Sequence, residues 1–178
     1  EKKEPEESYL LVDGYNIIFS WEELNGLAAV NITSARNALM DILSNYQGFR
    51  KDTLILVFDA YKVEGNPGQV YKYHNIYVVF TKEAETADQY IEKTVHKMGR
   101  RHQVTVATSD ALEQVIILGQ GARRLSAGDL KEAVEQASRE IREILKERRD
   151  TGKNYLLEAL PEELVSEMED VRLGRKKL

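Results

Sequence analysis

The sequence predicts an α/β fold in which a central, mostly parallel sheet of about four to five strands is covered by helices on both faces. Two continuous apolar runs, at residues 9–12 and 53–58, each lead directly into an aspartate, which is typical of buried parallel strands. Between them, behind the possible caps Thr33 and Ser34, apolar residues recur at helical spacing over residues 35–46. Strand, helix and strand in this order form a βαβ unit, from which parallel sheets are built.

The same alternation continues along the chain. Apolar runs predict strands at 76–80 and 104–107. Residues 123–125, Arg-Arg-Leu, are expected to form a short fifth strand. Further helices are predicted behind the cap candidates Thr86, Thr108 or Ser109, and Ser126. The helix after Ser126 is expected to bury an apolar stripe made of Leu130, Val134, Ala137, Ile141 and Leu145. Residues 60–74 are predicted to form a long loop of the kind that often carries function.

Length and composition indicate one globular domain. We expect a disordered leader at 1–7, the domain itself at 8–150, and a helical extension at 151–178 whose last helix starts near Pro161 and packs on the same domain. The sequence has no run of about 20 apolar residues and no signal-like start, so we expect a soluble, cytoplasmic protein with no membrane partner. It has no cysteine, so any bound metal must be held by oxygen or imidazole ligands.

Four aspartates are predicted to gather at one edge of the sheet. Asp13 and Asp59 end the first two strands, Asp88 lies in the first turn of the helix after the third strand, and Asp110 follows the fourth strand. In open parallel sheets, ligands bind at the carboxyl ends of the strands. Each acid taken alone is more often a helix cap or a turn residue than a functional group. Together they would repel one another unless a cation neutralises them, and carboxylates favour Mg²⁺ or Mn²⁺.

A metal held in this way can activate water for attack on a phosphodiester without a side-chain nucleophile. The sequence contains no Walker A motif, no dinucleotide-binding fingerprint, no nucleophile elbow and no zinc-protease helix motif. We therefore expect no nucleotide cofactor. The three histidines of the sequence show no spacing typical of metal ligands.

The acids are embedded in motifs that resemble a known family. The string at 12–18, Val-Asp-Gly-Tyr-Asn-Ile-Ile, resembles the opening motif of the NYN branch of PIN-like nucleases. Residues 57–61, 85–92 and 108–110 resemble the later acidic motifs of that branch, in the same order. Over its whole length, including the long helix and the C-terminal segment, the chain resembles the YacP-like NYN domain family.

This resemblance implies a PIN-like three-layer sandwich and a metal-dependent endoribonuclease that cleaves messenger RNA in association with the ribosome. It implies Asp13 and Asp88 as the main metal ligands, with Asp110 and Asp59 completing or supporting the site. It also implies that the side-chain amide of Asn16 positions a ligand or a phosphate.

Basic and aromatic residues near the predicted site are candidates for contacts with single-stranded RNA. Basic side chains can contact phosphates, and aromatic rings can stack on unpaired bases. The predicted RNA-binding set is Arg123, Arg124, Lys93, Lys97, Arg100, Tyr61 and Tyr73. Tyr71 is placed on the same loop as Tyr61 and Tyr73, while Trp21 and Tyr15 fit either base stacking or packing in the protein core.

Two other functions are consistent with the same residues. The chain could be a module that docks on RNA or on the ribosome without cutting. A phosphatase on a similar sheet is disfavoured, because Asp13 is not followed by a second aspartate two positions later.

Overall fold

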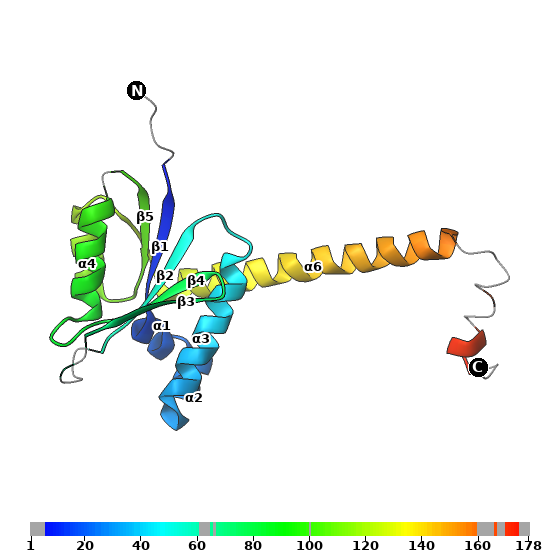
Figure 1. Cartoon of the computed structure of the whole chain (residues 1–178), viewed down its shortest axis with the longest axis horizontal. Helices are drawn as coiled ribbons and strands as arrows, with labels where there is room; N and C mark the ends of the chain where they lie inside the picture. The colour runs from blue at the N-terminus through cyan, green and yellow to red at the C-terminus, as the bar shows by residue number, and fades with distance from the viewer. Residues whose placement is uncertain are drawn as a thin grey trace. The chain divides into compact units, whose positions relative to one another are not determined.

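The structure is a computed structural model that describes residues 6–60, 65, 67–99, 101–159, 166 and 170–174 (Figure 1). The chain divides into two compact units, Glu1–Ala137 and Ser138–Leu178, which are described separately. Within the described residues, no helix is both long and apolar enough to cross a membrane.

The first unit is built on a six-stranded sheet with the strand order β3-β4-β2-β1-β5-β6. The strands are β1 Ser8–Asp13, β2 Thr53–Phe58, β3 Gln69–Tyr73, β4 Ile76–Phe80, β5 Gln103–Ala107 and β6 Arg123–Leu125. All neighbouring strands are parallel except β3, which runs antiparallel to β4 at one edge. The predicted α/β class with a mostly parallel sheet is therefore confirmed, with one strand more than expected.

The additional strand is β3, and the prediction that Tyr71 and Tyr73 lie on a loop is wrong. The sequence of β3, Gln-Val-Tyr-Lys-Tyr, is mostly exposed or half-buried, so it lacks the apolar run that reveals a central strand. A two-residue turn at His74 and Asn75 joins β3 to β4 and pairs Tyr73 with Ile76. His74 has a φ of 50°, the left-handed conformation that tight hairpin turns require.

Helices cover both faces of this sheet, as predicted (Figure 1). One face packs against α1 Gly14–Ser20, α2 Glu22–Val30, α3 Ile32–Gln47 and the first turns of α6 Ala127–Ala159. The other packs against α4 Ala87–Met98 and α5 Ala111–Gly119. Side chains alternate along each strand, so Leu10 and Val12 enter the first core while Leu11 enters the second.

The helix starts follow local capping chemistry. The side chain of Asn31 caps α3 by accepting the amide of Ser34, so the cap precedes the predicted Thr33 and Ser34. Thr86 caps α4 as predicted and forms a reciprocal capping box with Gln89. The hydroxyl of Ser126 accepts the amide of Asp129 at the start of α6, which is also as predicted.

The helices α1 and α2 were not predicted, and they decide the role of Trp21. This residue lies between them, is buried, and donates its indole N–H to the carbonyl of Ala127 at 2.8 Å. Trp21 is therefore a core residue that ties α1 and α2 to the start of α6, and it presents no free ring for an RNA base.

The apolar stripe of α6 is buried only in part. Leu130, Val134 and Ala137 belong to the core of the first unit. Leu145, in the second unit, is 49% exposed, so the prediction that it is buried is wrong. Helical periodicity identifies an apolar stripe, but burial requires a facing surface that periodicity does not provide. The helix predicted near Pro161 lies outside the described residues, and the packing of segment 151–178 stays a prediction.

Candidate metal centre at the carboxyl edge of the sheet

Three carboxylates meet at the carboxyl edge of the parallel strands. Asp13 is the last residue of β1, Asp88 lies in the first turn of α4, and Glu113 lies in the first turn of α5. One oxygen from each side chain lies within 4.8 Å of those of the other two. Since α4 follows β4 and α5 follows β5, the parallel arrangement delivers all three groups to one end of the sheet.

A close approach of backbone elements fixes the position of Asp13. The next residue, Gly14, begins α1 so near to β2 that a Cβ atom there would lie 2.4 Å from the ring of Phe58 and 2.9 Å from the carbonyl oxygen of Val57. Only glycine fits at this point. The Asp-Gly pair of the opening motif therefore combines a candidate acidic ligand with a residue that has no side chain, which lets α1 start directly behind it.

Asn16 holds the neighbouring loop against α1. Its side-chain oxygen accepts the amide of Ser109 at 2.7 Å, and the hydroxyl of Ser109 accepts the amide of Ala127 at 3.0 Å. The amide oxygen of Asn16 is thus used within the fold, between the acid of β1 and the loop that leads into α5. Contact of Asn16 with a ligand or a phosphate stays a prediction.

Glu113 is the group that the sequence did not reveal. It is 5% exposed, and both of its carboxylate oxygens are buried without a hydrogen-bond partner among the described residues. Burial, followed by the charges of Asp13 and Asp88, raises the pKa of Glu113 to about 9. The one sequence signal is an acid three residues after a helix-capping aspartate, which is also an ordinary capping pattern.

The predicted ligand Asp110 lies outside the group of three carboxylates. It is exposed, and its side chain accepts the amide of Glu113 at 3.3 Å, so it caps α5. The half-buried Asp59 also lies outside the group. Both are near enough for their charges to raise the pKa of Asp88, and Asp110 does the same for Asp13. Their direct part in metal binding stays a prediction.

The electrostatics of this centre favour a bound cation. Burial, and then the charge of Asp88, raises the pKa of Asp13 to about 6, while the backbone amide of Asn16 acts in the opposite direction. Burial is also the main cause of the raised pKa of Asp88. Carboxylates that repel one another and form no ion pair with a basic side chain have the chemistry of a site for a hard cation. The centre of Asp13, Asp88 and Glu113 could therefore hold a metal ion.

The predicted RNA-contacting cations are spread over two elements. Lys93 on α4 forms an ion pair with Glu85 at 2.8 Å, and Lys97 lies one turn farther from the acids. Arg123 and Arg124 are exposed on the edge strand β6, where Arg124 donates to the side chain of Gln114. Arg100 and Tyr61 lie outside the described residues.

Tyr73 lies at the amino ends of the parallel strands, whereas the acids lie at their carboxyl ends. It ends β3, which runs antiparallel, so it pairs with the first residue of β4, Ile76. Its hydroxyl donates to Asp41 of α3, and its ring packs edge-on against His74. The predicted stacking of Tyr73 on RNA bound at the carboxylates does not fit this position.

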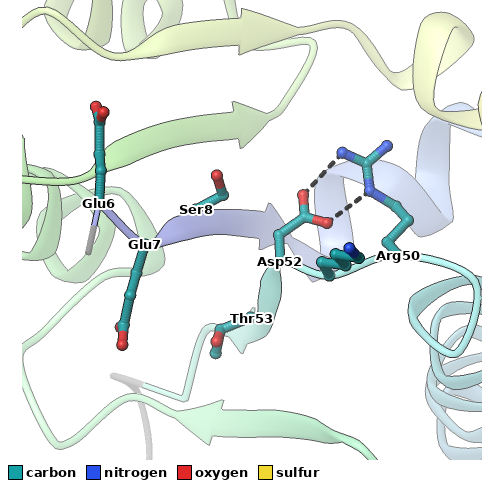
Figure 2. A pocket seen from close by; sticks show the side chains of 7 residues that line it. Glu6, Glu7, Ser8, Arg50, Asp52 and Thr53 are labelled. Carbon is teal, nitrogen blue, oxygen red and sulfur yellow. Dashed lines mark hydrogen bonds and ion pairs between the residues drawn. The ribbon is translucent and has the colours of Figure 1, made fainter.

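One hollow of the first unit lies away from the acids. It is lined by Glu6, Glu7, Ser8, Arg50, Lys51, Asp52 and Thr53, at the amino ends of β1 and β2 (Figure 2). Within it Arg50 and Asp52 form an ion pair through two hydrogen bonds of 2.8 Å. None of its lining residues belongs to the group of three carboxylates, so it has no part in that centre.

Comparison with known proteins agrees with this architecture. The sequence profile of the YacP-like NYN domain family matches residues 10–173. The chain is 41% identical over 170 residues to the protein YacP of Bacillus subtilis (strain 168), which covers 93% of this chain and 96% of that protein. A crystal structure of Rae1 (YacP) from Bacillus subtilis superimposes with a TM-score of 0.68 at 39% identity, covering 94% of this chain and 95% of that one. A mutant form of the same protein gives a TM-score of 0.70 over 80% of this chain and 84% of that one. The match over nearly the whole length, together with the Asp-Gly-Tyr-Asn start of α1, shows that the chain belongs to the YacP-like NYN domain family.

Proposed function

We propose that this protein is a metal-dependent endoribonuclease that cleaves messenger RNA in the cytoplasm, in association with the ribosome. The observation that carries the proposal is the centre of Asp13, Asp88 and Glu113, whose oxygens lie within 4.8 Å of one another. Membership of the NYN domain family supports a nuclease-type activity on RNA.

The residues of the centre would bind Mg²⁺ or Mn²⁺ through hard oxygen ligands. When bound, a divalent ion there would supply an activated water nucleophile and stabilise the charge on the departing oxygen of a phosphodiester. Asp13 is fixed by the tight start of α1, and Glu113 by its burial in α5, so neither side chain needs to be ordered when substrate arrives. Asp59 and Asp110 add negative charge beside the three ligands and so strengthen the preference for a cation.

Two groups of basic side chains would contact the RNA backbone. Lys93 and Lys97 lie on α4, whose first turn carries Asp88, and Arg123 and Arg124 lie on β6, next to β5. Their exposure suits phosphate contacts that weaken as salt rises. An overall charge of −5 favours RNA that is presented by a larger assembly over tight binding by this chain alone, and the ribosome would provide such presentation.

The proposal is tested by a cleavage assay on ribosome-engaged and naked messenger RNA with Mg²⁺ or Mn²⁺. Asp13→Asn and Asp88→Asn should abolish cleavage, and the products of the native protein should carry a 5′-phosphate and a 3′-hydroxyl. Asp129→Asn is the matched control, because this exposed aspartate also lies in the first turn of a helix, α6. Equal cleavage by all three variants would contradict the proposal.

The second candidate is a non-catalytic module that binds RNA or the ribosome through the same fold. It would be favoured if the protein binds its target while neither chelation nor the aspartate substitutions change the amount of intact RNA. The group of three carboxylates favours the enzyme, since it could hold the metal ion that cleavage would need.

A further inference from the structure

An exposed aromatic ring lies on the helix that follows the first metal-ligand candidate. Phe19 is 57% exposed and belongs to neither of the two hydrophobic cores of the first unit. It lies on α1, which begins immediately after Asp13. Six residues of helix separate Phe19 from Asp13, a rise of roughly 9 Å. The core therefore does not account for the ring, which lies on the short helix that starts at the carboxylate centre.

The inner side of this ring is backed by Tyr15. The two rings are stacked, with their centroids 6.2 Å apart and their planes at 23°. Tyr15 in turn packs on the buried Phe58, with a centroid distance of 5.1 Å. More than half of Phe19 remains open to solvent beside this support.

An arginine holds the supporting ring in place. Arg36 of α3 donates to the hydroxyl of Tyr15 at 3.0 Å and to the hydroxyl of Thr33 at 2.9 Å. Its guanidinium group lies over the ring of Phe80 at 5.9 Å from the centroid. Tyr15 is thus fixed at its hydroxyl by Arg36 and on its ring by Phe58, so the stack is formed before any ligand arrives. A ligand that stacks on a platform formed in advance loses less free energy to ordering.

We propose that Phe19, supported by Tyr15 and Arg36, is a stacking site for an unpaired base of the RNA whose backbone lies at the carboxylate centre. This inference rests on the proposed function and narrows its substrate to single-stranded RNA. An aromatic face accepts any base, so the site selects for unpaired bases and not for sequence. The faces of bases within a duplex are already stacked and are not available to it. The positive charge of Arg36 beside the stack also suits a polyanion better than an apolar protein surface.

The site is tested by fluorescence anisotropy with a short labelled oligoribonucleotide, in single-stranded and in duplex form. Ca²⁺ replaces Mg²⁺ so that the carboxylates are neutralised, and the oligonucleotide is verified to be intact by gel electrophoresis. Phe19→Ala should weaken binding of the single strand roughly tenfold, the loss expected when stacking on one base is removed. Phe19→Leu, which keeps an apolar side chain without a ring, should lose about as much, and Phe19→Trp should retain binding. Binding of the duplex should be the same for all variants.

Val30→Ala is the matched control, because Val30 is an 87% exposed apolar residue without a ring on the neighbouring helix α2. It should bind the single strand as tightly as the native protein does. Equal binding by Phe19→Ala and the native protein would overturn the stacking site, and so would a loss in Phe19→Ala that Phe19→Leu restores. Loss of co-sedimentation with ribosomes by Phe19→Ala, at unchanged RNA affinity, would make the ring a protein contact and would likewise overturn it. If the native protein binds single strands in a Phe19-dependent way but cuts nothing, the stacking site stands and the nuclease proposal fails. If the native protein binds no single-stranded oligonucleotide, the stacking site is overturned, and the nuclease proposal is decided separately by the cleavage assay on ribosome-engaged RNA.

Discussion

The two ends of the parallel strands, called here the amino edge and the carboxyl edge, differ in whether their charged side chains form ion pairs. At the amino edge, Arg50 is matched by both oxygens of Asp52 and by the hydroxyl of Tyr46, at 2.7 to 2.8 Å. At the carboxyl edge, no lysine or arginine of the described residues forms an ion pair with Asp13, Asp88 or Glu113. A hollow of the first unit lies at this amino edge (Figure 2). The comparison shows that a cluster of carboxylates without a basic partner in the described part of the chain identifies the candidate site here, whereas a depression in the surface does not.

The largest effect that we expect concerns the role of Glu113 in catalysis. Glu113→Gln should lower the rate of RNA cleavage at least about 100-fold, because residues that merely support a metal ligand already cost roughly 10- to 100-fold. The measurement is the single-turnover cleavage rate at saturating Mn²⁺. Glu132→Gln, which removes an exposed glutamate on α6, is the control and should cut at the native rate. Native cleavage by Glu113→Gln would limit the centre to the two aspartates.

The second prediction concerns how the stability of the metal-free protein depends on pH. The pKa of Glu113 is about 9 in the folded protein against an ordinary value of 4.5, so between these values the folded protein binds more protons than the unfolded chain. The free energy of unfolding should therefore fall as the pH rises from about 4.5 to about 9, by up to roughly 1.4 kcal/mol per unit of pH. Asp13 acts in the same direction between its ordinary pKa of 3.8 and about 6.

This pH dependence is measured by urea unfolding with chelator and with Mn²⁺. Added metal should remove most of the loss at high pH, since it stabilises the ionised carboxylates, and Glu113→Gln should flatten the metal-free curve above about pH 6. A metal-free stability that rises between pH 6 and pH 9 would contradict the assigned electrostatics.

The third prediction tests the tight start of α1. Gly14→Ala should lower the free energy of unfolding by roughly 1–3 kcal/mol or more, because the added Cβ would overlap the ring of Phe58. Gly26→Ala in α2 is the matched control: nothing lies within 4 Å of its added Cβ, and alanine should stabilise that helix by up to about 1 kcal/mol. Chemical unfolding of both variants is the measurement. A Gly14→Ala protein as stable as the native one would show that the approach to β2 is not restrictive.

The smallest effect is expected at the matched edge. Arg50→Ala should lower the free energy of unfolding by about 1 kcal/mol or less, since its side chain is partly exposed and surface ion pairs contribute little. RNA cleavage should be unchanged, because the residue lies at the opposite end of the sheet from the acids. A large loss of cleavage in a folded Arg50→Ala protein would show that the amino edge takes part in function.

The sequence could predict the parallel strands and the edge to which Asp13 and Asp88 are delivered. Both follow from local patterns, an apolar run that ends in an acid and a capped helix start. The place of Glu113 in the carboxylate group could not be predicted. It depends on how α5 packs, because this packing buries a side chain of its first turn close to Asp13 of β1. Asp110 follows the same pattern, and in the structure its side chain caps α5 and lies outside the group of three carboxylates, so its part in metal binding stays a prediction. The edge strand β3 was missed because its residues are only partly buried. The exposed ring of Phe19 was missed because periodicity does not show whether a single apolar residue is exposed.

The most direct test of the central claim is anomalous diffraction from crystals of the protein grown with Mn²⁺. The account predicts a manganese peak between the carboxylates of Asp13, Asp88 and Glu113, which disappears in the Asp13→Asn variant. A peak at another surface, or no peak at saturating Mn²⁺ with these side chains well ordered, would contradict it.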